Sequence, residues 1–241
     1  MMSGQPLDRH GEAEPDTARL LQTGVAPPSA CRHSPAAERN RAPILGQLQR
    51  WLPTRGRMLE IAAGTGQHAV YFAAALPGWD WQPTDPDPAA LASIDAWREA
   101  EPQPRLRPAV ALDVLAPDWA LAGPFDALFC ANLLHIAPWA VCAALMRGAA
   151  RLLAPAGQLI VYGPFVVDGV PTAPSNLAFD ADLRARDPAW GLRRLDDVQA
   201  EALAAGLQLL DQAALPANNR MLRFTRAVSA ASAASRAPAR R

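Results

Sequence analysis

The chain has 241 residues, half of them apolar, which is enough for one α/β domain with a large core or for two small domains. Basic and acidic residues number 23 each, so no net charge would draw the protein to nucleic acid or to anionic lipid. All 23 basic residues are arginine, which excludes any mechanism that needs a lysine base, a Schiff-base lysine or a phosphate-binding lysine.

Three cysteines, Cys31, Cys130 and Cys142, have neither an even count nor the spacing of metal ligands, so we expect no disulfide framework and no metal site. No run reaches the roughly 18 apolar residues that a membrane span requires. The first residues lack the basic and apolar regions of a signal peptide. We therefore expect a soluble protein of the cytoplasm that does not bind membranes.

The two ends of the chain have the composition of disordered segments. Residues 1–33 mix Gly, Pro, Asp, Glu and Arg without a hydrophobic period, and residues 229–241 are of low complexity. The sequence therefore predicts one folded domain over residues 34–228. A first helix is expected over residues 35–52, with Ser34 as its N-cap and Glu38 near the reciprocal capping position. Pro43 lies inside this helix and favours a break there.

Short apolar runs then alternate with longer periodic segments, the pattern of βα units around a mainly parallel sheet. The predicted strands cover residues 57–62, 80–84, 108–112, 125–131, 158–162, 207–213 and 221–226. The helices between them are expected over residues 66–76, 88–100, 138–153 and 196–205, the last one capped by Asp196. These elements predict a seven-stranded, mainly parallel Rossmann-like sheet closed by an antiparallel strand. The irregular segment 163–194 is too long for an ordinary connection and is interpreted as a lid or substrate-binding insert.

A glycine turn follows the first predicted strand, in the run Glu60-Ile-Ala-Ala-Gly64-Thr-Gly66-Gln-His68. Glycines let a backbone turn sharply and approach a ligand closely, and the next helix presents free N–H groups. Gly64-x-Gly66-x-x-Ala69 also satisfies the dinucleotide fingerprint, so the turn alone does not separate S-adenosylmethionine (SAM) from NAD. His68 is expected to face SAM or solvent.

Acidic residues end the next two strands. Asp85 follows the second strand, nineteen residues beyond Gly66, where a carboxylate can accept hydrogen bonds from both ribose hydroxyls of an adenosine ligand. Asp87 is interpreted as a helix N-cap. Asp113 ends the third strand and is suited either to the adenine amino group or to a surface turn.

These residues resemble the class I SAM-dependent methyltransferases, and more closely the methyltransferase-like protein 26 family. The resemblance covers about four-fifths of the chain and runs through Ser34-Pro-Ala-Ala-Glu38-Arg39-Asn40, Asp85-Pro-Asp-Pro, Asn132-Leu-Leu-His135-Ile-Ala-Pro-Trp139, Tyr162-Gly-Pro-Phe165, Thr172-Ala-Pro-Ser-Asn176 and Pro216-Ala-Asn218-Asn219. Ala62 departs from the wider superfamily, where a glycine is common. The resemblance implies the class I methyltransferase fold and SAM as cofactor, with binding residues Glu60, Ala62, Gly64, Gly66, Asp85, Asp113 and Asn132.

The methyl acceptor should lie beyond the carboxyl ends of the later strands, where open parallel sheets bind ligands. The residues there that we expect to bind the acceptor are Asn176, Asn218, Asn219 and Trp139, and those expected to serve catalysis are His135, Asn132 and Tyr162. An unperturbed histidine pKa near 6.5 suits a general base at neutral pH, although a structural role at a strand end fits His135 equally well.

The sequence therefore predicts a SAM-dependent methyltransferase with a small-molecule acceptor. Two alternatives stay open: an NAD-dependent oxidoreductase on a similar sheet, and a catalytically silent SAM-binding protein. Nucleic acid is disfavoured as a partner, because there is no basic stripe and no Asn/Asp-Pro-Pro-Tyr string after the fourth strand.

Overall fold

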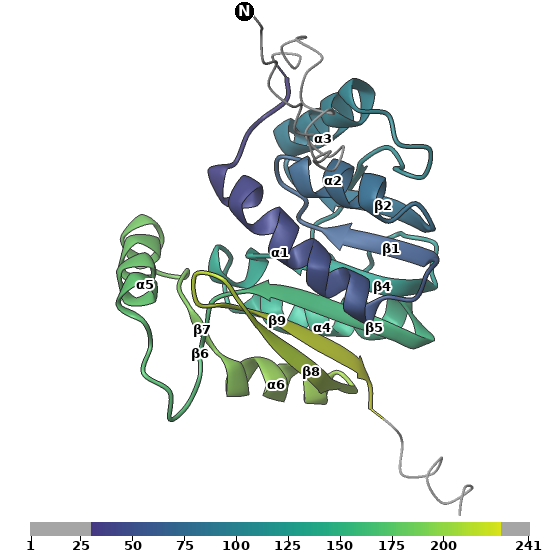
Figure 1. Ribbon diagram of the computed structural model, residues 1–241. Coiled ribbons are helices and arrows are strands. Elements are labelled where there is room, and N and C mark those ends of the chain that lie inside the picture. The colour runs from purple at the N-terminus through teal and green to yellow at the C-terminus, as the bar shows by residue number, and fades with distance from the viewer. Residues whose placement is uncertain (1–29, 228–241) are drawn as a thin grey trace, which may run out of the picture.

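The computed structural model describes residues 30–227, so the predicted disordered tail 229–241 and residues 1–29 of the predicted disordered arm 1–33 lie outside the described residues. One central sheet consists of β1 (Gly56–Ile61), β2 (Trp79–Asp85), β3 (Val110–Ala111), β4 (Phe125–Ala131), β5 (Leu153–Gly163), β8 (Leu207–Leu215) and β9 (Asn219–Arg226). Its strand order is β3-β2-β1-β4-β5-β9-β8 (Figure 1). The strands from β3 to β5 pair in parallel, and β9 is antiparallel to both β5 and β8. The predicted fold class is confirmed.

The helices of the described residues are α1 (Pro35–Trp51), α2 (Gln67–Ala75), α3 (Pro88–Ala100), α4 (Ala140–Leu152), α5 (Pro174–Arg186) and α6 (Leu195–Ala204). A short 3₁₀ helix, η2 (Leu133–His135), follows β4, and β6 (Phe165–Val166) pairs with β7 (Arg193–Arg194) in a small second sheet. None of these helices has the length and apolar character needed to cross a membrane.

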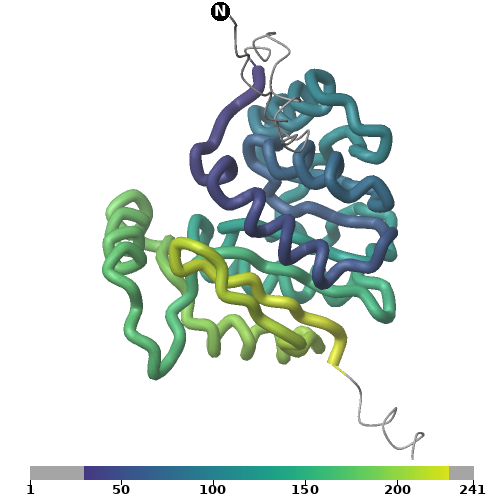
Figure 2. Tube along the Cα trace, in the orientation of Figure 1, coloured from purple at the N-terminus to yellow at the C-terminus, as the bar shows by residue number. Residues whose placement is uncertain are grey.

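Helices cover the sheet on both faces (Figure 1). Successive strand residues pack into different cores, one on each face. Leu59 and Leu159 contribute to the core under α4 and α6. Met58 and Ile160 contribute to the core under α1 and α2. The N-terminal half of the chain forms the part of the sheet with β1 to β3, and the C-terminal β8–β9 hairpin lies at the opposite edge (Figure 2).

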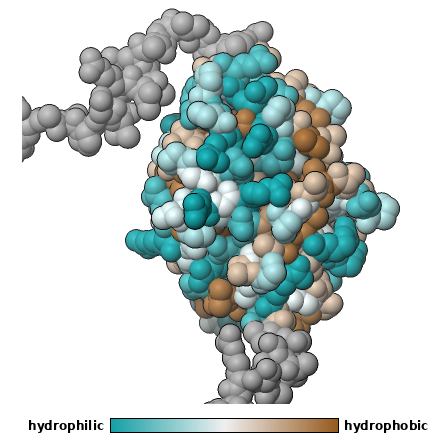
Figure 3. All heavy atoms as spheres, turned by 90° about the vertical axis from the view of Figure 1, so that its right-hand side faces the viewer, coloured by the Kyte–Doolittle hydropathy of each residue, from teal (hydrophilic) through white to brown (hydrophobic). Residues whose placement is uncertain are grey.

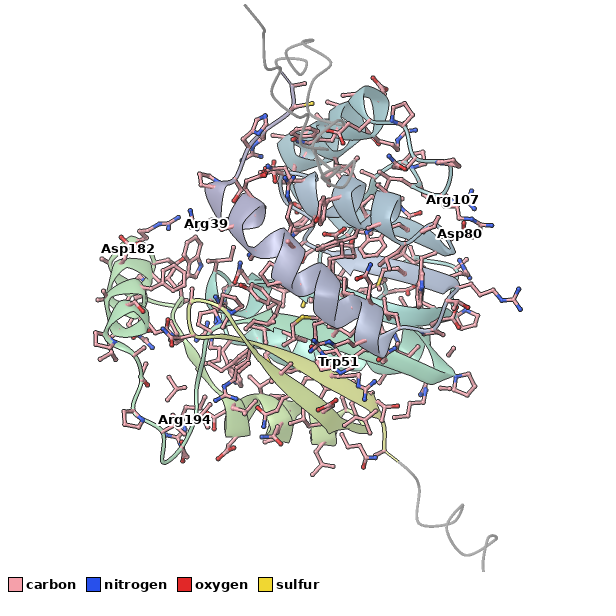
Figure 4. The ribbon with its side chains drawn as sticks, in the orientation of Figure 1. Arg39, Trp51, Asp80, Arg107, Asp182 and Arg194 are labelled. Atoms are coloured by element: carbon pink, nitrogen blue, oxygen red, sulfur yellow. The ribbon has the colours of Figure 1, made fainter. Side chains whose placement is uncertain are left out.

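Helix α1 crosses the front of the sheet and is attached at both of its ends (Figure 1). Ser34 is the predicted N-cap, accepting from the Ala37 backbone N–H at 3.3 Å. The reciprocal capping bond from Glu38 is not made: the Ser34 backbone N–H instead donates to Gln67 Oε1 of α2. The break expected at Pro43 is also absent, since α1 is one helix. At its other end, Trp51 Nε1 donates to Asp211 Oδ2 of β8 at 3.0 Å (Figure 4).

The folded part begins before Ser34, contrary to the predicted boundary. The Arg32 backbone N–H donates to Ser93 Oγ of α3 at 2.8 Å, and Trp97 Nε1 donates to the Arg32 carbonyl at 3.0 Å. The His33 ring packs edge-on against Trp97. Residues 31–33 are therefore part of the α3 side of the molecule, held by contacts that connect residues about 60 positions apart and leave no local pattern.

Further elements differ from their predictions. The fifth strand, expected over residues 158–162, has eleven residues in β5. The third strand shrinks from residues 108–112 to the two residues of β3. Segment 163–194, expected to be irregular, contains the thirteen-residue helix α5. Arg194, not Asp196, is the N-cap of α6, and Asp196 lies in its first turn, where its charge favours the helix dipole.

Candidate functional site

The glycine turn between β1 and α2 depends on left-handed backbone at Ala62 (φ 55°), Gly64 (φ 59°) and Gly66 (φ 86°). A Cβ on Gly66 would lie 2.7 Å from the Ile94 Cα atom of α3, so only glycine lets the two segments approach this closely. Ala62 adopts its left-handed conformation at a cost of about 1–2 kcal/mol. The turn thus keeps the geometry of a glycine at a position that carries alanine.

Asp85 holds this turn in place from the end of β2. Its Oδ2 accepts from the Gly64 backbone N–H at 2.9 Å, and its Oδ1 accepts from the Asp87 backbone N–H at 3.0 Å. The side chain is 7% exposed. Asp87 caps α3 as predicted, accepting from the Ala89 N–H at 2.9 Å. A carboxylate at the carboxyl end of a parallel strand is thereby fixed beside the glycine turn.

Asp113 lies beyond the short β3 in an exposed turn, where its Oδ1 accepts from the Leu115 backbone N–H at 2.8 Å. This local bond is the surface-turn role that the sequence also allowed. Its neighbour Leu112 ties the turn to the site, because the Leu112 N–H donates to the Asp85 carbonyl at 3.2 Å.

Glu60 lies beneath the turn and is 2% exposed. Its Oε2 accepts from Trp81 Nε1 of β2 at 2.6 Å. Burial raises the pKa of the Glu60 carboxyl to about 8, and the charge of Asp85 contributes in the same direction, while the Trp81 bond opposes it. Glu60 therefore carries a proton at neutral pH in this state, and a nearby cation would favour its ionised form.

His68 does not face solvent, which was one of its two expected environments. It is 8% exposed, and its Nε2 lies 2.7 Å from Asn40 Oδ1 of α1. The ring stacks on Phe72 at 5.1 Å between centroids, and burial lowers the pKa of His68 to about 4. His68 thus joins α1 to α2 next to the glycine turn.

Asn132 and His135 follow β4 on the next loop of the same sheet edge. Asn132 is left-handed (φ 60°), its backbone N–H donates to the Tyr162 carbonyl at 2.8 Å, and its side chain makes no capping bond to η2. His135 is the last residue of η2 and is 1% exposed. Neither of its ring nitrogens has a hydrogen-bond partner among residues 30–227.

The environment of His135 fixes the ring and keeps it neutral. A Cβ on Gly163 of β5 would lie 2.0 Å from His135 Nε2, and the Phe165 ring packs edge-on at 5.2 Å between centroids. Burial lowers the pKa of His135 to about 3; Arg193 lowers it further and Asp180 of α5 opposes this shift. Buried polar atoms nearly always have a hydrogen-bond partner, so the two unpaired ring nitrogens make His135 a candidate functional residue.

Tyr162 lies on the other face of the sheet. Its neighbours in β5 alternate, so Val161 packs in the core under α4 and α6 while Tyr162 packs in the core under α1 and α2. Burial raises the pKa of the Tyr162 hydroxyl, and a hydrogen bond with Asn40 opposes the shift. The structure therefore separates Tyr162 from His135, although the sequence placed both in one catalytic group.

A pocket of about 200 Å³ lies between the segment that precedes α5 and the β8–β9 hairpin. Residues 165–176 form one wall and residues 214–220 form the other. Asn176, Asn218 and Asn219, three of the four residues expected to bind the acceptor, line it together. Asn176 is 7% exposed, and its Nδ2 donates to the Asn218 carbonyl at 3.3 Å, so the two walls of the pocket are joined by a hydrogen bond.

Trp139, the fourth expected residue, is not among the residues that line this pocket. It precedes α4, and the Arg193 guanidinium lies over its ring at 5.6 Å from the centroid. Arg193 also donates to the Leu134 and Ala137 carbonyls at 2.8 and 2.7 Å, which braces η2. No local sequence signal identified Arg193, since the two carbonyls through which it braces η2 are nearly 60 residues away.

A second pocket of about 220 Å³ lies at the opposite end of the strands, lined by Arg57, Asp80, Gln82 and Arg107 among others. Figure 4 places Asp80 and Arg107 on one side of the molecule, with Arg39 of α1 and Asp182 of α5 on the other. Polar residues cover much of the face with the amino ends of the strands (Figure 3). Parallel sheets bind ligands at their carboxyl ends, so we assign the functional site to the α5 side. Within the described chain, no cluster of three or more His, Cys, Asp and Glu side chains is arranged to hold a metal ion.

The profile of one protein family matches residues 31–226, and its description is "Protein of unknown function (DUF938)". The chain belongs to the DUF938 family. The match covers all the described strands and helices, so the glycine turn, His135 and the asparagine-lined pocket are all within the DUF938 region.

Solved structures with the same fold are methyltransferases. CalO1, a methyltransferase in calicheamicin biosynthesis solved in an SAH-bound form, is 18% identical, with a TM-score of 0.65 over 80% of this chain and 55% of that one. An O-methyltransferase family protein from Burkholderia thailandensis is 17% identical, with a TM-score of 0.69 over 80% and 58% of the two chains. An O-methyltransferase family 2 protein from Planctomyces limnophilus, solved with apigenin, is 18% identical, with a TM-score of 0.66 over 88% and 62%.

The DUF938 chain spans less than two thirds of the length of these solved proteins. At this level of identity the likeness establishes the fold: the DUF938 chain has the Rossmann-like fold of class I SAM-dependent O-methyltransferases.

Proposed function

We propose that this protein is a methyltransferase that uses SAM and transfers its methyl group to a small molecule. The observation that carries the proposal is the bond between Asp85 and the Gly64 backbone, which unites a strand-end carboxylate and a left-handed glycine turn in a methyltransferase fold. A carboxylate fixed there is placed to accept from the ribose hydroxyls of an adenosyl group.

The residues present fit SAM. It carries an ammonium and a sulfonium and lacks the pyrophosphate of a dinucleotide, so carboxylates rather than cations should surround it. Asp85 and the buried Glu60 meet this need next to the turn. Ala62, Gly64, Gly66 and Asn132 supply backbone and amide groups around them, and Asp113 is assigned to the adenine side.

When bound, SAM supplies a methyl group that is already activated by the positive sulfur. The protein therefore has to orient the acceptor, exclude water and remove a proton. We assign the proton to a ring nitrogen of His135, which is neutral and has no competing partner among residues 30–227. Gly163 leaves room for the ring, and Phe165 and Arg193 hold it and its loop.

Other observations support the remaining parts of the proposal. CalO1 acts in calicheamicin biosynthesis and the Planctomyces limnophilus protein was solved with apigenin, which supports a small-molecule acceptor here. The sequence strings support kinship with the methyltransferase-like protein 26 family. The cysteine pattern supports the proposed cytoplasmic location, and the balanced charge supports the proposal that nucleic acid is not a partner. We also propose that segment 163–194, with α5, acts as the lid of the acceptor pocket.

Scanning calorimetry with SAM, S-adenosylhomocysteine (SAH) and NAD separates the proposal from the oxidoreductase alternative. A ligand at 100 times its Kd stabilises the folded state by about 2.7 kcal/mol, which raises the Tm by about 2–4 °C per kcal/mol. We expect this rise with SAM and SAH. A rise with NAD alone would contradict the proposal, and SAM binding without product formation from any acceptor pool would support the silent protein instead.

Asp85→Asn tests the site itself, because it keeps one carbonyl oxygen for the turn and removes the negative charge. We expect a fall in SAM affinity of about tenfold or more in titration calorimetry, since hydrogen bonds to charged groups contribute about 1.5–3 kcal/mol. Asp80→Asn is the matched control, at the other end of β2 and paired with Arg105 on the surface. Equal affinities in the two folded variants would remove Asp85 from the site.

A further inference from the structure

The pocket between residues 165–176 and 214–220 has an unbalanced charge. Its lining contains one charged side chain, Arg220 of β9, and no carboxylate. Its other polar groups are Thr172 and three asparagines, and apolar side chains such as Phe165 and Leu215 complete it. Arg220 is a partly buried residue, and a guanidinium in such a lining attracts an anion from solution.

Arg220 has no acidic partner among residues 30–227. Its Nη1 donates to the amide oxygen of Gln212 across the hairpin at 3.2 Å, and no ion pair involves it. Arg223, three residues along the same strand, pairs with Asp211 at 3.5 Å. The planar guanidinium of Arg220 therefore keeps donors for a carboxylate, which it can bind in bidentate fashion.

The asparagines supply the complementary chemistry. Their amide NH₂ groups bind the pocket wall: Asn176 donates to the Asn218 carbonyl at 3.3 Å, Asn218 to Ser175 Oγ at 3.4 Å, and Asn219 to the Pro216 carbonyl at 3.1 Å. The amide oxygens are then the groups available to a ligand, and they accept hydrogen bonds from hydroxyl or amino groups.

Arg220 also lies beside the proposed base. Gly163 pairs with Arg220 across the antiparallel β5–β9 ladder. Directly opposed residues of an antiparallel pair place their side chains on the same face of the sheet. That face carries His135, because the Gly163 Cβ position would touch His135 Nε2. Phe165 completes the link, since it lines the pocket and packs on the His135 ring.

We propose that the methyl acceptor is a small carboxylic acid with a hydroxyl or amino group, whose carboxylate is bound by Arg220 while its reacting group lies toward His135. The inference rests on the proposed function and adds the acceptor class. The pocket volume of about 200 Å³ limits the size. A cavity of about 150 Å³ accepts benzene, so this one has room for about one substituted ring.

The test compares acids with their own neutral amides. Titration calorimetry on the SAH-saturated protein would use a panel of one-ring and short acyclic hydroxy and amino acids, for example 3-hydroxybenzoate against 3-hydroxybenzamide. At least one acid should bind tenfold or more tightly than its amide. Arg220→Gln should remove that preference and leave the binding of the amide and of SAH unchanged.

Arg107→Gln is the control, because it removes the same charge from an exposed arginine at the opposite end of the sheet (Figure 4). The inference is wrong if no acid in the panel binds more tightly than its amide, or if Arg220→Gln leaves the preference intact. The SAH titration, done first, reports on the proposed function separately. Should SAH fail to bind, that function fails, and the acid–amide comparison without SAH still decides whether Arg220 selects carboxylates.

Discussion

Gly163→Ala tests whether His135 is held as tightly as its packing indicates. The added Cβ would lie 2.0 Å from His135 Nε2 and 2.8 Å from its Cδ2 carbon, whereas ordinary contacts begin at 3.4 Å. The ring is 1% exposed and has Phe165 against it, so it has no open space on these sides. Accommodating the methyl group requires a shift of roughly 1 Å or more in the ring or in β5.

Overpacking of this kind costs about 1–3 kcal/mol, and each kcal/mol lowers the Tm by about 2–4 °C in a domain of this size. Misplacing a catalytic group by 1 Å can reduce turnover about 100-fold. We therefore expect a lower Tm in scanning calorimetry and a large loss of kcat for any acceptor that the wild-type protein methylates. SAM affinity should change little, because Asp85 and the glycine turn are untouched.

Gly46→Ala is the matched control, since nothing lies within 4 Å of the Cβ position on this α1 glycine. Replacing glycine by alanine inside a helix should stabilise the protein by about 0.5–1 kcal/mol. A folded Gly163→Ala variant with wild-type Tm and turnover would show that the His135 ring moves aside freely. The argument for a fixed base would then be refuted.

Three further predictions concern the glycine turn and the two buried ionisable groups. Ala62→Gly should raise the Tm by a few degrees in calorimetry, because it removes about 1 kcal/mol of left-handed strain at φ 55°; an unchanged or lower Tm would contradict that strain. Glu60→Gln should be more stable than wild type at pH 8 to 9 by urea denaturation. The Glu60 carboxyl keeps its proton up to about pH 8 in the folded protein and releases it near pH 4.5 in the unfolded protein, so wild-type stability falls as pH rises between these values. Equal pH dependence of stability in the two proteins would contradict a raised pKa of Glu60. The acid limb of kcat/KM should lie below pH 5, because neutral His135 is the base and its pKa is about 3; a limb near pH 6.5 would assign the base to another group.

Much of the fold was predictable because its signals are local. The strand from residues 125 to 131 was predicted with its observed bounds, since an apolar run between turn signals is typical of a central parallel strand. The Ser34 and Asp87 caps were also correct, because a capping side chain bonds to a backbone N–H two or three residues away. Helix α5 was missed because its exposed surface lacks a clear apolar period, with only Asn176 and Leu183 buried.

The sequence predicted at which end of the strands the candidate site lies, but it did not predict which face of the sheet each residue occupies. Residues at the carboxyl ends of parallel strands lie at the same end of the sheet, whatever their side chains are. Asp85 after β2 therefore lies close enough to the turn after β1 to accept a hydrogen bond from Gly64. Tyr162 and His135 were grouped because both follow strands, yet strand alternation sends Tyr162 to the α1 side. His68 binds Asn40, a partner that no spacing rule specifies.

Helix α1 joins two parts of the molecule that are four strands apart in the sheet, with Gln67 after β1 at one end and Asp211 of the edge strand β8 at the other. Its seventeen residues span about 25 Å. Ile44 and Leu48, both fully buried, anchor it between these ends. A nick in the link between α1 and β1 would therefore leave the helix held only by non-covalent contacts, which are the hydrogen bonds at its two ends and the packing of Ile44 and Leu48. Loss of the helix would then remove support from the glycine turn and from the hairpin in one step.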